Sequence, residues 1–305
     1  MAELALHRKI ATSLEGTHPE QRIRRLVWKI VIATLILMGI GSATRVMDAG
    51  LACPDWPLCY GQFVPEQQMN LQVFLEWFHR LDAALIGLSV IALVGLSWWY
   101  RRYLPRGLPW ASTLALGLVV FQGVLGGLTV TELLRFDIVT AHLGIALLFF
   151  STLTVIGAAL TPYKGTAAVG KLPWVGLTGA VFVYLQSLLG GLVASRWALH
   201  QCLGGSQLCA VMNSHIMGVV PATLATLAVV VMAWRTPGLH PILRKLANWA
   251  GGLVGLQVLL GVATFQLHLH VEALTVAHQA VGAALLGALV AFTVLAMRDR
   301  ATAWS

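Results

Sequence analysis

Four histidines carry the clearest chemical signal in this chain of 305 residues. Each begins an apolar stretch that ends in a cation 20 or 22 residues later. At the helical rise of about 1.5 Å per residue, such a stretch spans about 30 Å, the thickness of a membrane's hydrocarbon layer. The four imidazoles are therefore expected at one depth, near one membrane face. They are His79, His142, His215 and His278, followed by Arg101, Lys164, Arg235 and Arg298.

Four equivalent histidines within a bilayer indicate ligands, because a buried imidazole is costly and has a partner. A single one could equally make a hydrogen bond between helices. Zinc prefers four ligands in a tetrahedron, and no clustered methionines favour copper. Two facing imidazoles in an apolar cleft suit a haem, so the pattern predicts two bis-histidine haem sites. Arginines on the same side are candidates to pair with propionates, or else extend their cations to the interface: Arg45, Arg80, Arg135 and Arg196.

The composition indicates a polytopic membrane protein. Apolar residues make up 58% of the chain and charged residues 10%, with a mean hydropathy of +0.78. A soluble domain carries about 25% charged residues. The eight expected spans are roughly 26–46, 72–99, 110–131, 138–161, 173–194, 211–234, 244–266 and 274–297.

The cations give an orientation. Of the 20 lysines and arginines, 16 fall on the side of the two termini. By the positive-inside rule both termini are cytoplasmic in a cell membrane, and the histidines lie toward the outer face. The first span lacks a cleavage site and is interpreted as a retained anchor. The high pI thus reflects topology, and we expect no nucleic-acid partner.

The four cysteines fall in predicted outer loops, as Cys53 with Cys59 and Cys202 with Cys209. Close cysteine pairs outside the cytoplasm form disulfides. Neither pair has the C-x-x-C spacing of a thioredoxin-like site. The chain also lacks C-x-x-C-H, which excludes covalent haem attachment of the c type.

An internal repeat organises the chain. The phrase Q-x-x-L-G occurs at Gln122, Gln186 and Gln257, and each copy leads to a histidine in the next span. The glycines are explained by close helix packing alone, and the glutamines by hydrogen bonds between helices. Glycines one or two turns after the histidines are alternative candidates to clear space for a ring: Gly87, Gly144, Gly218 and Gly282.

The repeat unit is a helical hairpin, and spans 1–4 resemble spans 5–8. The predicted fold is an all-α membrane protein with eight transmembrane helices in two pseudo-symmetric four-helix bundles. We expect a cytoplasmic tail over residues 1–25, an N-terminal bundle over 26–165 and a C-terminal bundle over 166–300.

The two halves differ at the first histidine. Glu76 precedes His79 by three residues and so lies on the same helix face. A carboxylate there could move protons or stabilise a developing cation. It could equally be a first-turn acid that pairs with Arg80. The second half carries Met212-Asn-Ser-His-Ile216, without acid or arginine, which suggests one reactive site and one electron-relay site.

At these residues the chain resembles the haem A synthase family. The resemblance rests on E-x-x-H-R at Glu76–Arg80, the cysteine loop Gly50–Gly61, the repeat and the four histidines. It implies that His79 and His142 flank substrate haem O, and that His215 and His278 ligate a resident haem B. It also implies that Glu76 is an essential acid. The C8 methyl group of haem O would be hydroxylated twice and lose water to give the formyl group of haem A.

The resemblance further implies a set of partners: an electron donor, haem O synthase and cytochrome oxidase assembly factors. The cysteine pairs match pairs seen in the family, for which a redox role is suspected, and we favour structural disulfides. A substrate that enters from lipid would make the N-terminal site the looser one. The alternatives are a di-haem cytochrome b that carries electrons from quinol, and a haem carrier or exporter.

Overall fold

The computed structural model describes residues 19–194, 207–267 and 271–302. These residues form eight helices long and apolar enough to cross a membrane, which confirms the predicted all-α membrane fold. Two short 3₁₀ helices, η1 (Glu66–Gln68) and η2 (Arg101–Tyr103), lie in the connections. The long helices are α2 (Pro19–Val46), α3 (Leu71–Trp99), α4 (Leu108–Thr131), α5 (Phe136–Ala159), α6 (Leu172–Val193), α7 (Gln207–Arg235), α8 (Pro241–Gln266) and α9 (Glu272–Thr302).

Local signals set several helix starts. Asn70 precedes α3, and its side-chain oxygen accepts a hydrogen bond from the Val73 amide at 2.9 Å. Proline lies in the first turn of α4, α6 and α8. Its missing N–H costs nothing there, because first-turn amides have no partner within the helix. Seven of the eight spans therefore begin within four residues of the predicted positions, whereas α2 begins at Pro19, inside the segment predicted as a tail and seven residues before the predicted start of the span at 26.

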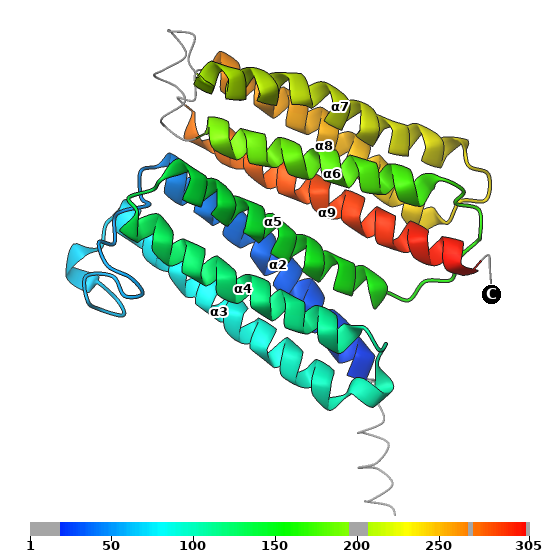
Figure 1. Cartoon of the computed structure of the whole chain (residues 1–305), viewed down its shortest axis with the longest axis horizontal. Coiled ribbons are helices and arrows are strands. Elements are labelled where there is room, and N and C mark those ends of the chain that lie inside the picture. Colours follow the sequence, from blue (N-terminus) through cyan, green and yellow to red (C-terminus); the bar gives the residue numbers. More distant parts are fainter. Residues whose placement is uncertain (1–18, 195–206, 268–270, 303–305) are drawn as a thin grey trace, which may run out of the picture.

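The helices form two groups of four (Figure 1). Within α2–α5 each helix packs against the next, and α2 also packs against α5. Within α6–α9 the same pairs occur. Between the groups, α9 contacts α2 and α5, and α5 contacts α6. This pattern is consistent with the predicted two-fold repeat, because exchanging the groups maps each contact onto another.

The core runs along the contact between the groups. Leu285, Leu289 and Phe292 of α9 are fully buried there. Gly287 of α9 lies against Phe150 of α5, where an added Cβ would be 2.8 Å from the ring. This close approach brings α9 of the second group beside the helices of the first.

The connection between the groups is fastened at the helix ends opposite the histidines. The Tyr163 hydroxyl donates to Asp299 at 2.6 Å, and the Thr166 amide donates to the same carboxylate at 3.0 Å. Burial, and then the bond to Asp299, raises the pKa of Tyr163, so the phenol remains a donor. Arg298 donates to the carbonyls of Ala158 and Thr161 at 2.8 and 2.7 Å.

Candidate functional site

A cavity of about 1450 Å³ lies among α2, α3, α4, α5 and the loop 47–70. It exceeds the roughly 300–1000 Å³ of common small-molecule pockets. Most of its wall is apolar, as a large flat cofactor requires. Seven of the predicted site residues line this one cavity: Arg45, Cys59, Glu76, His79, Arg80, Arg135 and His142.

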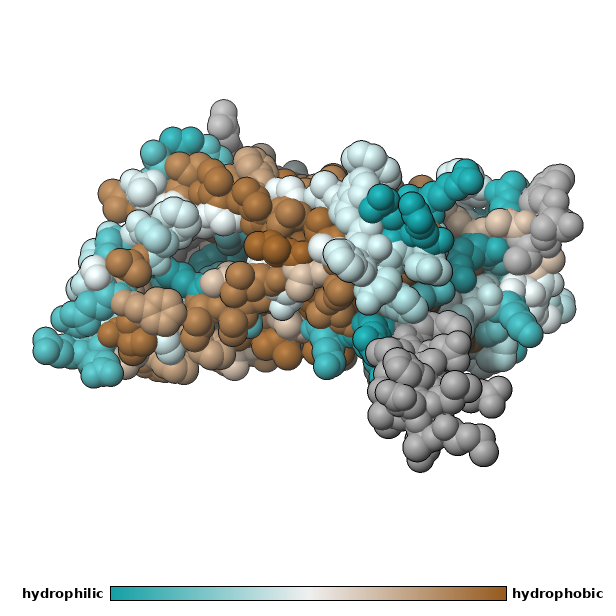
Figure 2. Space-filling view, turned by 90° about the horizontal axis from the view of Figure 1, so that it is seen from below, coloured by the Kyte–Doolittle hydropathy of each residue, from teal (hydrophilic) through white to brown (hydrophobic). Residues whose placement is uncertain are grey.

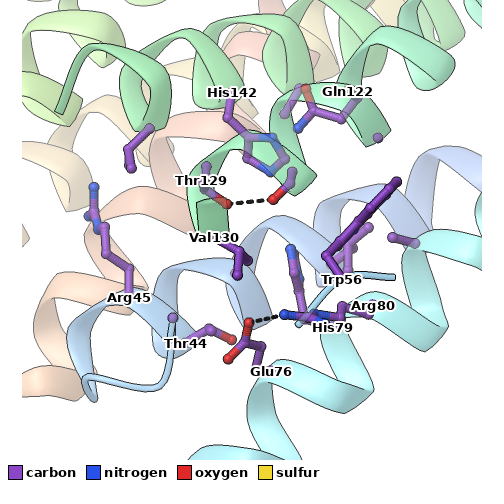
Figure 3. Close-up of a pocket in the computed structure, with 18 of the residues that line it drawn as sticks. Thr44, Arg45, Trp56, Glu76, His79, Arg80, Gln122, Thr129, Val130 and His142 are labelled. Atoms are coloured by element: carbon purple, nitrogen blue, oxygen red, sulfur yellow. Dashed lines mark hydrogen bonds and ion pairs between the residues drawn. The ribbon is translucent and has the colours of Figure 1, made fainter. Parts of the chain in front are cut away.

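His79 of α3 and His142 of α5 point into the cavity from opposite sides (Figure 3). They are close enough to interact electrostatically. The Nδ1 atom of each is buried and has no hydrogen-bond partner among the described residues. The pair therefore fits the ligands of a metal held between α3 and α5.

Each imidazole lies against a glycine of the preceding helix. Three of these glycines end the repeated Q-x-x-L-G phrase, and the fourth is its degenerate counterpart in α2. A Cβ there would approach the imidazole Cε1 closely, so glycine makes room for the ring. The pairs are Gly41–His79 at 2.8 Å, Gly126–His142 at 3.4 Å, Gly190–His215 at 2.9 Å and Gly261–His278 at 3.0 Å. The sequence favoured helix packing as the reason for these glycines, and the structure shows that the group packed against each of them is an imidazole ring.

The repeated glutamines of the second half contact its histidines. Gln186 Nε2 donates to the His215 carbonyl at 2.6 Å and lies 3.0 Å from its Nδ1. Gln257 Nε2 lies 3.3 Å from His278 Nε2. The predicted glutamine bonds between helices are therefore present. Gly218 and Gly282, considered as ring-clearing glycines, instead lie beside these two amides.

The second histidine pair shares the glycine neighbours of the first but differs in its hydrogen bonds, because glutamine amides lie beside its ring nitrogens. His215 of α7 and His278 of α9 are close enough to interact electrostatically. Over the described ranges, no group of three or more His, Cys, Asp or Glu side chains could hold a metal ion. Pairs of imidazoles match the axial positions of a haem iron and fall short of a tetrahedral zinc site.

Glu76 and Arg80 hold the cysteine loop over the cavity. Glu76 is 3% exposed, and its Oε2 accepts the Cys53 amide at 2.7 Å. Its Oε1 accepts a hydrogen bond from Arg80, which forms the salt bridge that the sequence offered as one alternative for Glu76. Arg80 also donates to the carbonyls of Asp55 at 2.6 Å, Leu58 at 2.5 Å and Cys53 at 3.3 Å. A propionate at Arg80 would have to compete with these bonds.

The loop is closed by the predicted disulfide between Cys53 and Cys59. Its tip is ordered by Asp55, which accepts the Tyr60 and Gly61 amides at 2.6 and 2.7 Å. The Gly61 amide, the largest contribution, lowers the pKa of Asp55, so the carboxylate stays ionised. Arg196 and Cys202 lie outside the described residues, and Cys209 lies in the first turn of α7, not in a loop as predicted.

Trp56 extends this loop along the cavity wall. Its indole lies against Gly127 of α4, where a Cβ would be 3.2 Å from the ring. Leu58 and Phe63 of the same loop also line the cavity. The loop therefore covers the end of the cavity nearest the histidines.

The two remaining described arginines differ in their partners. Arg135 is exposed and pairs with Asp137 at 2.8 Å and Glu132 at 3.3 Å. Arg45 donates to Gln279 of α9 at 3.2 Å. Of the three predicted arginines that the structure describes, Arg45 is thus the one without a carboxylate partner among the described residues.

The cavity opens sideways between α3 and α4. Figure 2 shows this face, with a hollow framed by hydrophobic residues and hydrophilic residues at its base. Leu85 and Leu88 of α3 line the cavity while 54% and 63% exposed. Gly123 of α4 also lines it and is exposed. The exposed residues at this opening belong to two helices long and apolar enough to cross a membrane, and sequence reasoning could not detect the opening.

Sequence reasoning also missed Thr275 and Gln279, which α9 contributes to the cavity. They lie in the half of the chain that was expected to form the other site. Their only sequence signal is their place on the same helix as His278. The helix packing of the whole molecule is needed to bring them to this wall.

The described residues thus form an all-helical membrane protein with two histidine pairs between its helices, the class of helical bundle in which facing helices can hold a cofactor. Residues 24–290 match the family described as cytochrome oxidase assembly protein, COX15-CtaA. The chain belongs to this family, and the resemblance to haem A synthases is confirmed.

Named relatives agree. A haem A synthase of Caulobacter vibrioides is 30% identical over 87% of this chain and 94% of its own. One of Shewanella oneidensis is 31% identical, over 58% of this chain and 59% of its own. A protoheme IX farnesyltransferase of Halobacterium salinarum is 34% identical, over 46% of this chain and 30% of its own. The last two alignments thus span less than two thirds of those relatives.

Proposed function

We propose that this protein is a haem A synthase, an oxidoreductase that converts the C8 methyl group of haem O to the formyl group of haem A. The carrying observation is the large cavity in which His79 and His142 face each other beside Glu76. Similarity to a haem A synthase over most of both chains supports the same activity. The conversion removes four electrons from the methyl carbon, so each of two successive hydroxylations consumes one dioxygen as the oxidant, with two electrons from an external donor and two protons, and releases one water. The resulting geminal diol then loses water to give the formyl group.

In this proposal His79 and His142 hold the iron of haem O from opposite sides. Bound haem supplies the redox chemistry. The lateral opening between α3 and α4 admits a lipid-soluble substrate and releases the product. The loop with Trp56 covers the cavity end and limits access of water, which strengthens electrostatic interactions inside.

Glu76 acts as a fixed negative charge. Its two oxygens accept hydrogen bonds, one from the Cys53 amide and one from Arg80. A held carboxylate one helical turn from an iron ligand stabilises positive charge that develops on the reacting methyl carbon. Its two bonds make proton transfer a secondary role, because a proton carrier would have to release one of them.

The second histidine pair, His215 and His278, holds a resident haem B. The amides of Gln186 and Gln257 orient these imidazoles. The second half lacks a counterpart of Glu76, so it serves electron transfer. Residues 26–165 then form the substrate half and 166–300 the resident-haem half.

We place the protein in the cell membrane with both termini in the cytoplasm. The cation distribution supports this orientation. Exposed aromatic side chains lie near the helix ends on the cytoplasmic side, as expected at a membrane interface: Trp99, Tyr103, Trp110, Trp174, Trp234 and Trp249. A prenyl-transfer enzyme such as haem O synthase supplies the substrate, and cytochrome oxidase assembly factors receive the product.

The test is substitution of Glu76 by Gln in cells that also make haem O. We expect wild-type protein to yield haem A and Glu76→Gln to lower conversion by about 100-fold or more, the scale of losing one oriented electrostatic group. The purified variant should keep its resident haem. Chromatography of extracted haems measures the conversion.

Glu132→Gln is the matched control, because Glu132 also pairs with an arginine in the same half but is exposed. It should convert haem O like wild type. Retained conversion in Glu76→Gln would remove this carboxylate from the mechanism. Wild-type protein that binds haem O without converting it would instead favour a di-haem cytochrome or a haem carrier.

A further inference from the structure

We propose that the cavity contains a carboxylate-binding subsite at the junction of the two halves, made by Arg45 of α2 with Thr275 and Gln279 of α9. Its ligand is a propionate of the porphyrin. The inference rests on the proposed function and deepens it, because it makes the substrate site depend on a helix of the other half.

The first observation is the state of Arg45. It lines the cavity, and its Nη2 donates to the neutral Gln279 Oε1 at 3.2 Å. No carboxylate of the described residues lies within ion-pair distance of it. A guanidinium within a membrane protein calls for an anion, because desolvation of an uncompensated charge is costly. Arg80 and Arg135 line the same cavity, and each already has a carboxylate.

The second observation, independent of the first, is Thr275. It is 9% exposed and lines the cavity, and its Oγ1 is buried without a hydrogen-bond partner among the described residues. Buried hydroxyls in proteins are normally satisfied. Of the seven buried threonines among the described residues, Thr264 and Thr275 lack such a bond, and the other five donate to a carbonyl of their own helix: Thr34, Thr44, Thr154, Thr226 and Thr293. The Thr275 hydroxyl is therefore available to a ligand.

Gln279 positions the subsite. It lies one turn after Thr275 on α9, so both side chains share a helix face. Its amide oxygen fixes the Arg45 guanidinium, and a guanidinium has further N–H groups for a carboxylate. Figure 3 shows Arg45 in the cavity, apart from the Glu76–Arg80 pair.

The repeat supplies an internal comparison. The spacing of His142 and His278 makes Val139 and Leu143 the counterparts of Thr275 and Gln279. The spacing of Gly41 and Gly190 makes Ala194 the counterpart of Arg45. All three counterparts are apolar. General packing between the halves therefore does not require the polar set, which belongs to one side of the junction.

The chemistry of the ligand follows from the proposed substrate. A porphyrin of this class carries its propionates on one edge, and the rest of the ring is apolar. When the iron is held between His79 and His142, the propionates at that edge require a cation and neutral hydrogen-bond donors from the cavity wall. A charged guanidinium with a hydroxyl matches a carboxylate, and Arg45 is the cavity arginine still without one.

The experiment compares haem B with its dimethyl ester, titrated by absorbance into the purified full-length protein in phosphatidylcholine nanodiscs. Loss of the titratable signal in His79→Ala assigns it to the cavity. Because hydrogen bonds to charged groups contribute about 1.5–3 kcal/mol, wild-type protein should prefer the diacid by about 10- to 100-fold. Arg45→Gln and Thr275→Val should each reduce that preference by about 10-fold, and Arg45→Lys should restore part of it.

Thr264→Val is the matched control. Its Oγ1 is equally buried and unpartnered, but it lies on α8 and does not line this cavity. It should keep the full preference. The absorbance spectrum of the resident haem shows whether each variant is folded. If Arg45→Gln misfolds, the nearly isosteric Thr275→Val still tests the subsite.

Equal affinity of wild-type protein for diacid and ester would overturn the subsite. So would an unchanged preference in both Arg45→Gln and Thr275→Val. If Arg45 instead holds a lipid phosphate, adding phosphatidylglycerol would abolish the preference, which also overturns the proposal. Haem O conversion is measured separately. Its failure with an intact diacid preference would reject the synthase and leave the subsite standing.

Discussion

Replacing Gly41 by Ala is a small change with a large expected effect. A Cβ on Gly41 would lie 2.8 Å from His79 Cε1 and 3.4 Å from each ring nitrogen. Carbon atoms pack favourably at about 3.5–4.0 Å, so the ring must retreat by roughly 0.7 Å or more. Ligand constellations tolerate about 0.5 Å of misplacement. The substitution therefore displaces the imidazole beyond what iron ligation accepts.

Gly39 is the matched control, because it lies in the same helix and has nothing within 4 Å of its Cβ position. Both changes improve helix propensity by up to about 1 kcal/mol. Overpacking at Gly41 alone costs about 1–3 kcal/mol. We therefore expect Gly41→Ala to weaken haem O binding by about 10- to 100-fold and Gly39→Ala to leave it unchanged.

Absorbance titration of purified protein with haem O measures both affinities, and thermal unfolding checks that both variants remain folded. Equal affinities for the two folded variants would refute the reasoning. The imidazole of His79 would then not hold the iron where the structure positions it.

Two further substitutions test what fastens the fold around the site. Arg80→Gln removes the donors to three loop carbonyls, so a membrane-impermeant reductant should open the loop disulfide about 10-fold faster by thiol labelling. Arg135→Gln changes only an exposed ion pair and should not alter that rate. Equal reduction rates in Arg80→Gln and wild-type protein would contradict the anchoring role of Arg80. Asp299→Ala leaves buried donors without partners and should destabilise the protein by about 2–3 kcal/mol in unfolding experiments, whereas Tyr163→Phe should cost about 1 kcal/mol. An unchanged unfolding transition in Asp299→Ala would show that this carboxylate does not fasten the connection.

Much of the fold could be predicted because its signals are local. Span lengths follow from apolar runs, and a helix places residues at fixed rises, so equal spacing to a cation predicted equal depth for the histidines. The Cys53–Cys59 disulfide followed from loop position and proximity in sequence. The Glu76–Arg80 pair followed from their i, i+4 spacing.

The partners of the arginines could not be predicted in this way. The four arginines predicted on the outer side looked equivalent in sequence: Arg45, Arg80, Arg135 and Arg196. The folded chain commits Arg80 to loop carbonyls and Arg135 to exposed acids, and leaves Arg45 with an amide of α9. These bonds depend on loop paths, which helical periodicity does not specify.

The sequence by itself determined the number of spans, the disulfide loop and the family, and it predicted one depth for the four histidines. Only the tertiary structure decided that Glu76 binds the Cys53 amide, that the cavity opens between α3 and α4, and that α9 completes its wall. The physical reason is the range of the interactions. Periodicity and spacing act within one helix or hairpin, whereas a cavity wall is set by how separate helices pack, and that depends on side chains far apart in the chain.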